Sequence, residues 1–457
     1  MQIDGRTVRR IRRWLPAVVL SAAAARAAAQ STPAAPPRTF TLVNATIHPA
    51  SGPDIPSGHV VVRDGRIAEV GAGPAAASEG AVVDLKGRHV YPSLLPPFTV
   101  LGLAEISAVR ATVDTGEVGE VNPAARASVA VNYDSELMPV ARSGGVLIAG
   151  VTPTGSVISG TAAVMRMQGW TREDGAPRDP AAITVFWPDL TIDRSPDAAT
   201  SVEKQKKQRD ERVRRLKDAF RDARSYAASR AAEGKPGVPR HDDDPRMDAL
   251  VPAIEGKIPV VVHAQKLDQI RDAVAWAREE KLRLVIWGGA DAWRAADELA
   301  KADVAVAVDS PVELPQRQDE PYDAQYANAG RLAAAGVRVL FNYGGEPSDA
   351  ANVRNLPQFV AAAVAFGFPK EKALASVTLE PAKVLGVADR VGSIEPGKDA
   401  TLIVTDGDLF DIRSHVVAAY LDGKELDLSD KQKRLYERYR NRPKPSGTPG
   451  TTGSRKP

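Results

Sequence analysis

Short apolar runs separated by turn residues begin at Thr39 and dominate the first part of the chain. Five such runs follow one another with glycine, proline or aspartate between them, at residues 39–47, 59–63, 66–70, 81–85 and 88–91. The sequence RDG at residues 63–65 is typical of a hairpin turn. A similar pattern returns after Gly392, where Asp422–Gly423 indicates another hairpin. We therefore predict a composite β-sandwich built from both ends of the chain.

The middle of the chain alternates between strand-type and helix-type patterns. Ile258–His263 is a continuous β-branched run, typical of a strand buried on both faces, and helix-spaced apolar residues follow it. Further strands are predicted at residues 146–151, 183–186, 282–287, 304–308 and 337–341. This alternation is typical of βα units. It favours the α/β class and a (β/α)8 barrel of the TIM type over an open sheet.

A charged insertion at residues 200–246 interrupts this alternation. Between Ser201 and Arg246 it holds 14 basic and 9 acidic residues. One apolar stripe repeats at helical spacing within it, formed by Val213, Leu216, Phe220, Ala223 and Ala227. We expect a helix packed on the barrel; a lid over the active face is the alternative.

The two ends of the chain differ from its body in composition. Residues 1–30 hold six arginines and one aspartate around a short Ala-rich apolar stretch, which is typical of a signal peptide. A linker is expected at 31–38 and a basic, disordered tail at 428–457. The domain boundaries between them are 39–92 for the first half of the sandwich, 93–390 for the barrel and 391–427 for the second half. We expect export to the periplasm or medium, with no transmembrane segment in the mature protein.

Composition excludes several kinds of chemistry. The chain has no cysteine, so thiolate metal sites, disulfides and cysteine nucleophiles are excluded. The net charge of +3 comes from the arginine-rich start, and the near-neutral remainder gives no reason to expect nucleic-acid binding. Of the six histidines, only His263 ends a predicted barrel strand.

Four stretches make the chain resemble the amidohydrolase superfamily, in the branch around imidazolonepropionase-like and prolidase-like enzymes. They are residues 84–103, 150–170, 258–277 and 373–408, the last being the most specific. The resemblance implies metal-assisted hydrolysis of carbon–nitrogen bonds other than ordinary peptide bonds. It also implies metal ligands at the carboxyl ends of the barrel strands.

Most of those ligand positions hold residues that cannot bind a metal. The two histidines expected after the first strand fall on Phe98 and Val100, and the sixth-strand histidine falls on Trp287. The position of a carboxylated lysine falls near Arg166, which stays protonated. The eighth-strand aspartate falls on Tyr343 or Gly344, so only the fifth-strand histidine survives, as His263. We expect a degenerate, apolar metal site.

The remaining candidates define a modest site. His263 and Asp309 are the candidate catalytic residues, and a substrate would be bound by Arg166, Trp287, Glu346 and Asp349. No cofactor is expected; the alternative is a single zinc-like ion on His263 with nearby carboxylates. Each candidate also has a structural interpretation, such as core packing for Trp287 or an ion pair for Arg166.

Two functions follow from this sequence. The first is a divergent amidohydrolase acting on carbon–nitrogen, non-peptide bonds of a small-molecule substrate. The second is a catalytically inactive, exported relative that binds a small molecule or a protein partner. An open pocket at His263 with a carboxylate in hydrogen-bond reach would favour the first. A pocket filled by Phe98, Val100 and Trp287 would favour the second.

Overall fold

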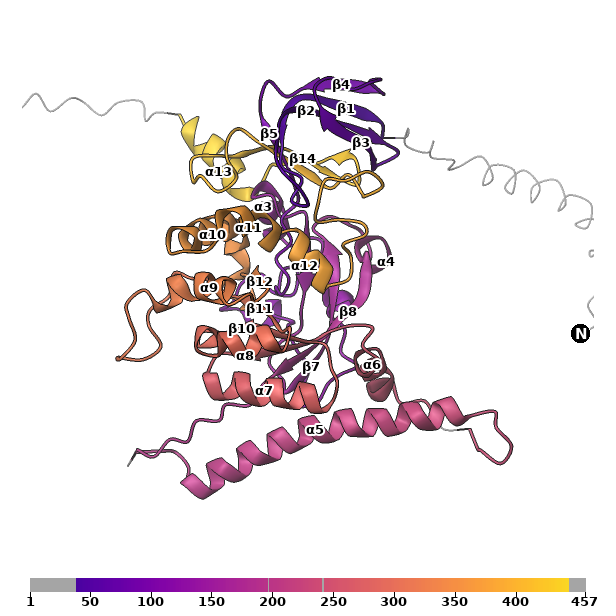
Figure 1. Ribbon diagram of the computed structural model, residues 1–457, viewed down its shortest axis with the longest axis vertical. Coiled ribbons are helices and arrows are strands. Elements are labelled where there is room, and N and C mark those ends of the chain that lie inside the picture. The colour runs from indigo at the N-terminus through magenta and orange to yellow at the C-terminus, as the bar shows by residue number, and fades with distance from the viewer. Residues whose placement is uncertain (1–37, 196, 241, 444–457) are drawn as a thin grey trace, which may run out of the picture. The chain divides into compact units, whose positions relative to one another are not determined.

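The computed structural model describes residues 38–443, apart from residues 196 and 241. The predicted signal peptide, most of the linker and the end of the tail lie outside the described residues, as does His241. Two sheets organise the described chain (Figure 1).

The first sheet combines strands from both ends of the chain. Its path is β15-β14-β13-β5-β1-β2-β3, with β4 paired to β1. The amino-terminal strands are β1 (Phe40–Ile47), β2 (Ile55–Arg63), β3 (Arg66–Ala72), β4 (Ala81–Asp84) and β5 (His89–Pro92). The carboxyl-terminal strands are β13 (Leu402–Thr405), β14 (Val416–Leu421) and β15 (Lys424–Glu425). The two groups join where β13 pairs antiparallel with β5. Strands from both ends of the chain therefore share one hydrogen-bonded sheet.

The second sheet carries the α/β part of the molecule. Its seven strands run in the order β12-β11-β10-β9-β8-β7-β6. They are β6 (Ile148–Val151), β7 (Ile158–Arg166), β8 (Arg178–Phe186), β9 (Val260–Ala264), β10 (Leu284–Gly288), β11 (Ala305–Val308) and β12 (Val339–Phe341). Strands β8 to β12 are mutually parallel, as predicted from their apolar runs. In Figure 1, α7 to α10 are stacked along the outer side of β9 to β12.

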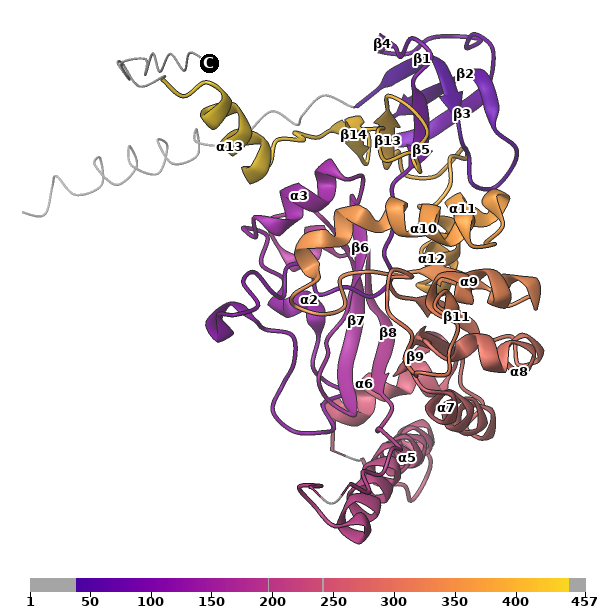
Figure 2. The ribbon, with the colours of Figure 1, turned by 90° about the vertical axis from the view of Figure 1, so that its left-hand side faces the viewer.

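This sheet differs from the eight parallel strands of the predicted barrel. β7 runs antiparallel to both β6 and β8, and Figure 2 shows β7 and β8 as long strands side by side. The reason is connection length, since only residues 152–157 link β6 to β7 and a parallel pair needs a crossover of about a dozen residues or more. The segment expected to be the first strand makes isolated parallel bridges, from Thr99 to Val151 of β6 and from Leu94 to Val146 just before β6. It also reaches past β12, where the Val100 amide donates to the Gly344 carbonyl oxygen at 2.8 Å.

Helices cover the outer side of the second sheet and fill the links between its strands. The α-helices before the insertion are α2 (Ala127–Ala130), α3 (Leu137–Ser143) and α4 (Arg172–Gly175). Those after it are α6 (Pro245–Ile254), α7 (Leu267–Glu279), α8 (Ala296–Lys301), α9 (Ala324–Ala334), α10 (Leu356–Ala365), α11 (Lys370–Ser376) and α12 (Leu379–Val384). Short 3-10 helices are η1 (Arg110–Thr112), η2 (Ala292–Ala295) and η3 (Ala350–Asn355).

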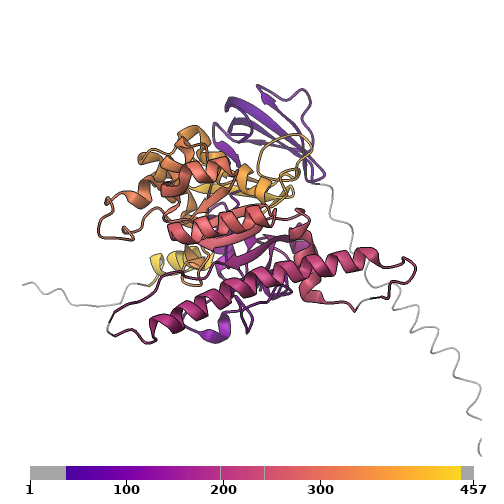
Figure 3. The ribbon, with the colours of Figure 1, turned by 60° about the horizontal axis from the view of Figure 1, so that its bottom comes forward.

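The charged insertion forms one long helix, α5 (Val202–Ala232), which crosses the outside of the molecule in Figure 3. Leu216, Phe220 and Ala223 of its predicted apolar stripe are buried. The Phe220 ring meets the Trp276 ring of α7 edge-on, with centroids 4.9 Å apart. The helix therefore packs on the barrel's outer layer, as expected.

The tail begins with a further helix, α13 (Lys431–Arg440), where the sequence had suggested a disordered segment. Asp430 caps it, because its side chain accepts a hydrogen bond from the Lys433 amide at 2.8 Å. Among the residues that the structure describes, no helix has both the length and the hydropathy needed to cross a bilayer.

Candidate functional site

The carboxyl ends of four parallel strands, β9 to β12, meet around one cavity of about 330 Å³. His263 reaches it from β9 and Trp287 from β10, while Asp309 follows β11. Tyr343, Glu346 and Asp349 come from the loop after β12. Five of the six predicted site residues therefore line one cavity, at the end of the strands where barrel enzymes place their chemistry.

His263 is held neutral by its surroundings. Its ring centroid lies 4.7 Å from that of Phe186 and 5.0 Å from that of Trp287. Its Nε2 lies 3.2 Å from Gln265 Nε2. Burial lowers the pKa of His263 to about 4, because the imidazolium loses its hydration among these rings.

The orientation of Gln265 fixes which nitrogen of His263 carries the proton. Gln265 Oε1 accepts a hydrogen bond from the Ala290 amide at 3.1 Å, so its amide nitrogen faces the histidine. Nε2 of His263 must then accept, which leaves the proton on Nδ1.

Asp309 is the most perturbed carboxyl group of the site. Its Oδ1 accepts hydrogen bonds from Trp287 Nε1 at 3.0 Å and from Asn342 Nδ2 at 2.9 Å. Burial raises its pKa to about 6, against these two hydrogen bonds and with help from the charges of Asp349 and Glu346. A carboxyl group with a pKa near 6 can exchange a proton at neutral pH, as general acid–base catalysis requires.

Two further carboxyl groups share this environment. Burial raises the pKa of Glu346, and the charge of Asp349 raises it further. The pKa of Asp349 is also raised by burial, although hydrogen bonds from Ser348 and Tyr343 oppose the shift. The site therefore gathers carboxyl groups that hold their protons more strongly than usual.

Arg166 is the predicted site residue that the structure does not bring to this cavity. It ends β7, and because β7 is antiparallel its carboxyl end lies beside the amino ends of β6 and β8. Both Arg166 Nε and Nη2 lie 2.8 Å from Asp422 Oδ2 of the first sheet. The arginine thus joins the two sheets, and the substrate role expected for it has no support in its position.

Three of the positions that the resemblance aligns with metal ligands hold apolar or aromatic side chains, Phe98, Val100 and Trp287. Phe98 and Val100 are fully buried. The Phe98 ring centroid lies 5.7 Å from that of Trp287, and its backbone amide donates to Asn342 Oδ1 at 2.9 Å. Within residues 38–443, apart from 196 and 241, no three His, Asp or Glu side chains are grouped as a metal ion requires. The described residues therefore form no ligand group for the two-metal centre that the resemblance implies.

Sequence reasoning missed the amides that organise this cavity. Asn342 directly follows the buried strand β12 and connects the Phe98 backbone to Asp309. Gln265 follows β9 in the same way. Each is a polar residue at the end of an apolar strand, and that signal could have found them.

Glycine permits the close packing around Trp287. A Cβ atom at Gly345 would lie 2.2 Å from Trp287 Cζ2. The sequence Tyr343–Gly344–Gly345 therefore lets the loop after β12 pass over the indole that holds Asp309.

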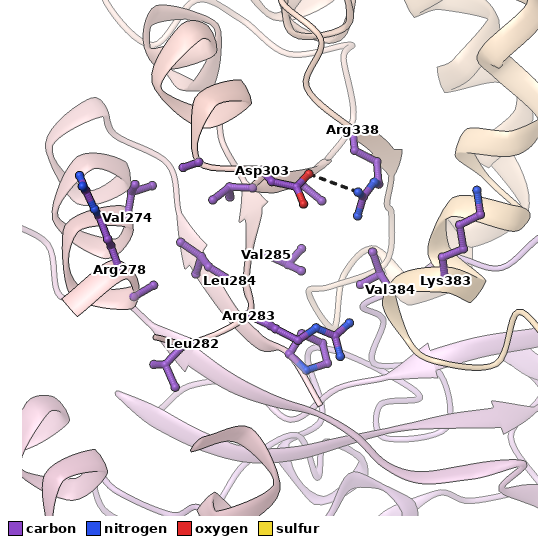
Figure 4. Close-up of a pocket in the computed structure, with 15 residues that line it drawn as sticks. Val274, Arg278, Leu282, Arg283, Leu284, Val285, Asp303, Arg338, Lys383 and Val384 are labelled. Carbon is purple, nitrogen blue, oxygen red and sulfur yellow. Dashed lines mark hydrogen bonds and ion pairs between the residues drawn. The ribbon is translucent and has the colours of Figure 1, made fainter. Parts of the chain in front are cut away.

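A second cavity of about 440 Å³ lies at the opposite ends of the strands, and Figure 4 shows its lining. Arg338 points toward Asp303, and Nη2 lies 3.3 Å from Oδ1. Arg278, Arg283 and Lys383 surround the apolar side chains of Leu284 and Val285. Although larger, it lies at the amino ends of β10 and β11, where barrel enzymes do not place catalysis.

Comparison with known proteins decides the family. The amidohydrolase family profile matches residues 149–428, more than half of the chain. The chain belongs to the amidohydrolase family. A crystal structure of an amidohydrolase from Thermotoga maritima MSB8 is 26% identical, with a TM-score of 0.74. The similarity covers 85% of this chain and 99% of that one.

Curated relatives of this amidohydrolase agree with the assignment. Amidohydrolase tasK of Hapsidospora irregularis is 25% identical over 80% of the chain. The chain spans only 39% of the length of that relative. The imidazolonepropionase of Erwinia tasmaniensis is 36% identical over 94 residues, which are 20% of this chain and 19% of that enzyme.

Proposed function

We propose that this amidohydrolase hydrolyses a carbon–nitrogen, non-peptide bond of a small molecule held in the 330 Å³ cavity. Asp309 and His263 are the catalytic residues of this reaction. They act in place of the metal centre, which the described residues do not fit. The observation that carries the proposal is Asp309, a carboxyl group with a pKa of about 6 at the end of a barrel strand. The names of the relatives, amidohydrolase and imidazolonepropionase, support the reaction class.

The proposed reaction assigns one role to each group. Asp309, as carboxylate, takes a proton from water while the water oxygen attacks the carbonyl carbon. The Nδ1–H of His263 supplies a hydrogen-bond donor for the carbonyl oxygen, which gains negative charge. Asp309 then returns the proton to the leaving nitrogen as the carbon–nitrogen bond breaks. Trp287 and Asn342 fix the Asp309 carboxylate throughout, through their hydrogen bonds to Oδ1.

A second candidate function is ligand binding without turnover. It is favoured by the buried Phe98 and Val100, and by His263, which makes no hydrogen bond to a carboxylate in the described part of the chain. On this interpretation the cavity keeps its ligand and has lost the hydrolytic step.

Hydrolysis of a panel of amides, lactams and cyclic imides tests the first function. The protein is dialysed against a chelator before assay. We expect activity to survive chelation and kcat to fall about 100-fold in Asp309→Asn, the size of a general-base contribution. Asp272→Asn is the matched control, because Asp272 is an aspartate whose pKa is also raised by desolvation but which does not line this cavity.

Each other result of the panel has a defined meaning. Activity that disappears with the chelator and returns with zinc would contradict the metal-free reaction. A wild-type protein that hydrolyses none of the panel but still binds small molecules would support the second function.

We also propose that the protein is exported, on the basis of the arginine-rich start and the Ala-rich stretch that follows it. Fractionation of cells that express the full chain tests this. The mature protein is expected in the periplasm or medium, and a full-length cytoplasmic protein would contradict it.

A further inference from the structure

The cavity at the ends of β9 to β12 has an uncompensated negative charge. Four carboxyl groups line it, from Asp309, Glu313, Glu346 and Asp349, and no lysine or arginine does. None of the four makes an ion pair with another described residue. Elsewhere the described chain pairs its acids repeatedly, as when Arg317 binds Asp291 at 2.9 Å. The cavity therefore presents carboxyl groups that have no cationic partner among the described residues.

A second, independent observation concerns hydrogen-bond acceptors in the wall. Asn328 of α9 lines the cavity and is only 4% exposed. Its amide nitrogen donates to the Gly289 carbonyl oxygen at 2.9 Å. Its side-chain oxygen is buried and has no hydrogen-bond partner among the described residues. A buried acceptor without a donor destabilises the folded protein, so a bound donor would remove that cost.

Gln325, one turn earlier on α9, also lines the cavity and also binds backbone through its amide nitrogen. It is 7% exposed, and its amide nitrogen donates to the Ala290 carbonyl oxygen at 3.4 Å. Since the nitrogen of each amide is bound to backbone, both side chains offer oxygen to the cavity. The wall therefore combines carboxyl groups that lack an ion-pair partner with one buried acceptor that lacks a donor, the Asn328 side-chain oxygen.

We propose that this cavity binds an organic cation with N–H donors, namely a primary ammonium, amidinium or guanidinium group. The cationic group lies between the Asp309 carboxylate and the Asn328 side-chain oxygen, with Asp349 and Glu346 at the outer side. This inference names the substrate class of the proposed hydrolase and rests on that function only in using the same cavity. It also holds if the protein binds its ligand without turnover.

The same wall suits an organic cation better than a metal ion. A zinc ion needs about three donors within about 2.3 Å, and no such group exists in the part of the chain that the structure describes. A planar amidinium presents several N–H groups in different directions, so it can reach acceptors that stand further apart. A cavity of 330 Å³ also has room for a ring or chain behind the charged group.

Calorimetric titration of the full-length protein tests the proposal with four probes. Benzamidine has the charge and the N–H donors, tetramethylammonium has the charge alone, and benzyl alcohol lacks the charge. Zinc chloride is the metal probe. We expect benzamidine to bind at least about tenfold more tightly than tetramethylammonium and benzyl alcohol, the scale of a lost charge-assisted hydrogen bond. No stoichiometric zinc binding is expected at the cavity.

Variants locate the site, after thermal unfolding confirms that each is folded. Asp309→Asn and Asp349→Asn should each weaken benzamidine binding about tenfold, because each removes one carboxylate charge. Asp272→Asn removes the same charge outside the cavity and should leave binding unchanged. The probe series on wild-type protein gives a result even if a variant fails to fold.

The contrary outcomes are distinct. Equal binding of benzyl alcohol and benzamidine, or equal loss of binding in Asp272→Asn, would overturn the organic-cation site. So would stoichiometric zinc binding that disappears in Asp309→Asn. Benzamidine binding without hydrolysis of any amide would leave this inference standing and contradict only the hydrolase. Hydrolysis of neutral amides that benzamidine does not inhibit would contradict the organic-cation site and leave the hydrolase standing.

Discussion

At the scale of single residues, burial shifts the pKa values of the two candidate catalytic groups in opposite directions. It raises the pKa of Asp309 to about 6 and lowers that of His263 to about 4. Both shifts favour the neutral form of the group, as expected where charge is removed from water. Their effects on stability oppose each other between pH 4 and 6, so variants are needed to separate them.

Asp309→Asn should stabilise the protein at neutral pH relative to wild type. Because the folded pKa of Asp309 is raised, ionisation disfavours the folded state, and wild-type stability falls as the pH rises from about 4 to 6. The asparagine does not ionise and can still accept the hydrogen bonds from Trp287 and Asn342. Urea unfolding should show the variant more stable by about 1–3 kcal/mol at pH 8 and by little at pH 4. A gap that does not change with pH would contradict the raised pKa.

His263→Gln should show the opposite dependence. The folded pKa of His263 is lowered, so its protonation favours the unfolded state and wild-type stability falls as the pH drops from about 6.5 toward 4. Glutamine removes that titration. The difference in unfolding free energy between wild type and variant should therefore shift against wild type on acidification. NMR titration of the His263 ring checks the same point directly, and a pKa at or above 6.5 would refute it.

At the scale of elements, apolar periodicity predicted most strands and the insertion helix. The runs ending at His263 and Trp287 became β9 and β10, since a strand buried on both faces needs a continuous apolar sequence. β7 was missed because its sequence ISGTAAVMR begins with small and polar residues. The reversal of β7 was missed with it, and Arg166 was consequently assigned to the wrong end of the sheet.

The candidate site was predictable only in part for the same reason. His263, Asp309 and Trp287 follow apolar strands, so their common edge could be inferred from sequence. Asn328 and Gln325 come from the middle of a helix, and nothing in a helical pattern shows which polar side chains point at a cavity. The charge imbalance of the cavity therefore required the structure.

Helix α5 should owe its position mainly to its buried stripe. Phe220→Ala removes a fully buried ring that packs against Trp276, and we expect a loss of about 3–5 kcal/mol in the free energy of unfolding. Lys206→Ala, on the exposed face of the same helix, should change stability by less than about 0.5 kcal/mol. Because α5 contributes no residue to the 330 Å³ cavity, benzamidine binding by folded Phe220→Ala should match wild type. Weaker benzamidine binding would instead support the alternative that α5 is a lid over the active face.

At the scale of the whole molecule, residues far apart in sequence hold the two sheets together. The first sheet needs both chain ends, as the 4.7 Å stacking of Phe40 on Tyr420 illustrates. Arg166 and Asp422 then connect the second sheet to it across 256 positions of sequence. This ion pair therefore has a structural role.

Arg166→Met should accordingly reduce stability without affecting the ligand. The Arg166–Asp422 pair is partly exposed, so a double-mutant cycle with Asp422→Asn should give a coupling of about 0.5–1.5 kcal/mol that weakens with salt. Benzamidine affinity should remain at the wild-type value. A large loss of benzamidine affinity in folded Arg166→Met would show that Arg166 contributes to the binding site.

One measurement addresses the whole account directly: a crystal structure of the protein grown with benzamidine and zinc chloride, with anomalous data at the zinc absorption edge. We predict the amidinium group within hydrogen-bond distance of Asp309 and Asn328, and no zinc peak at His263. Paired zinc peaks beside His263, with the benzamidine elsewhere, would contradict it.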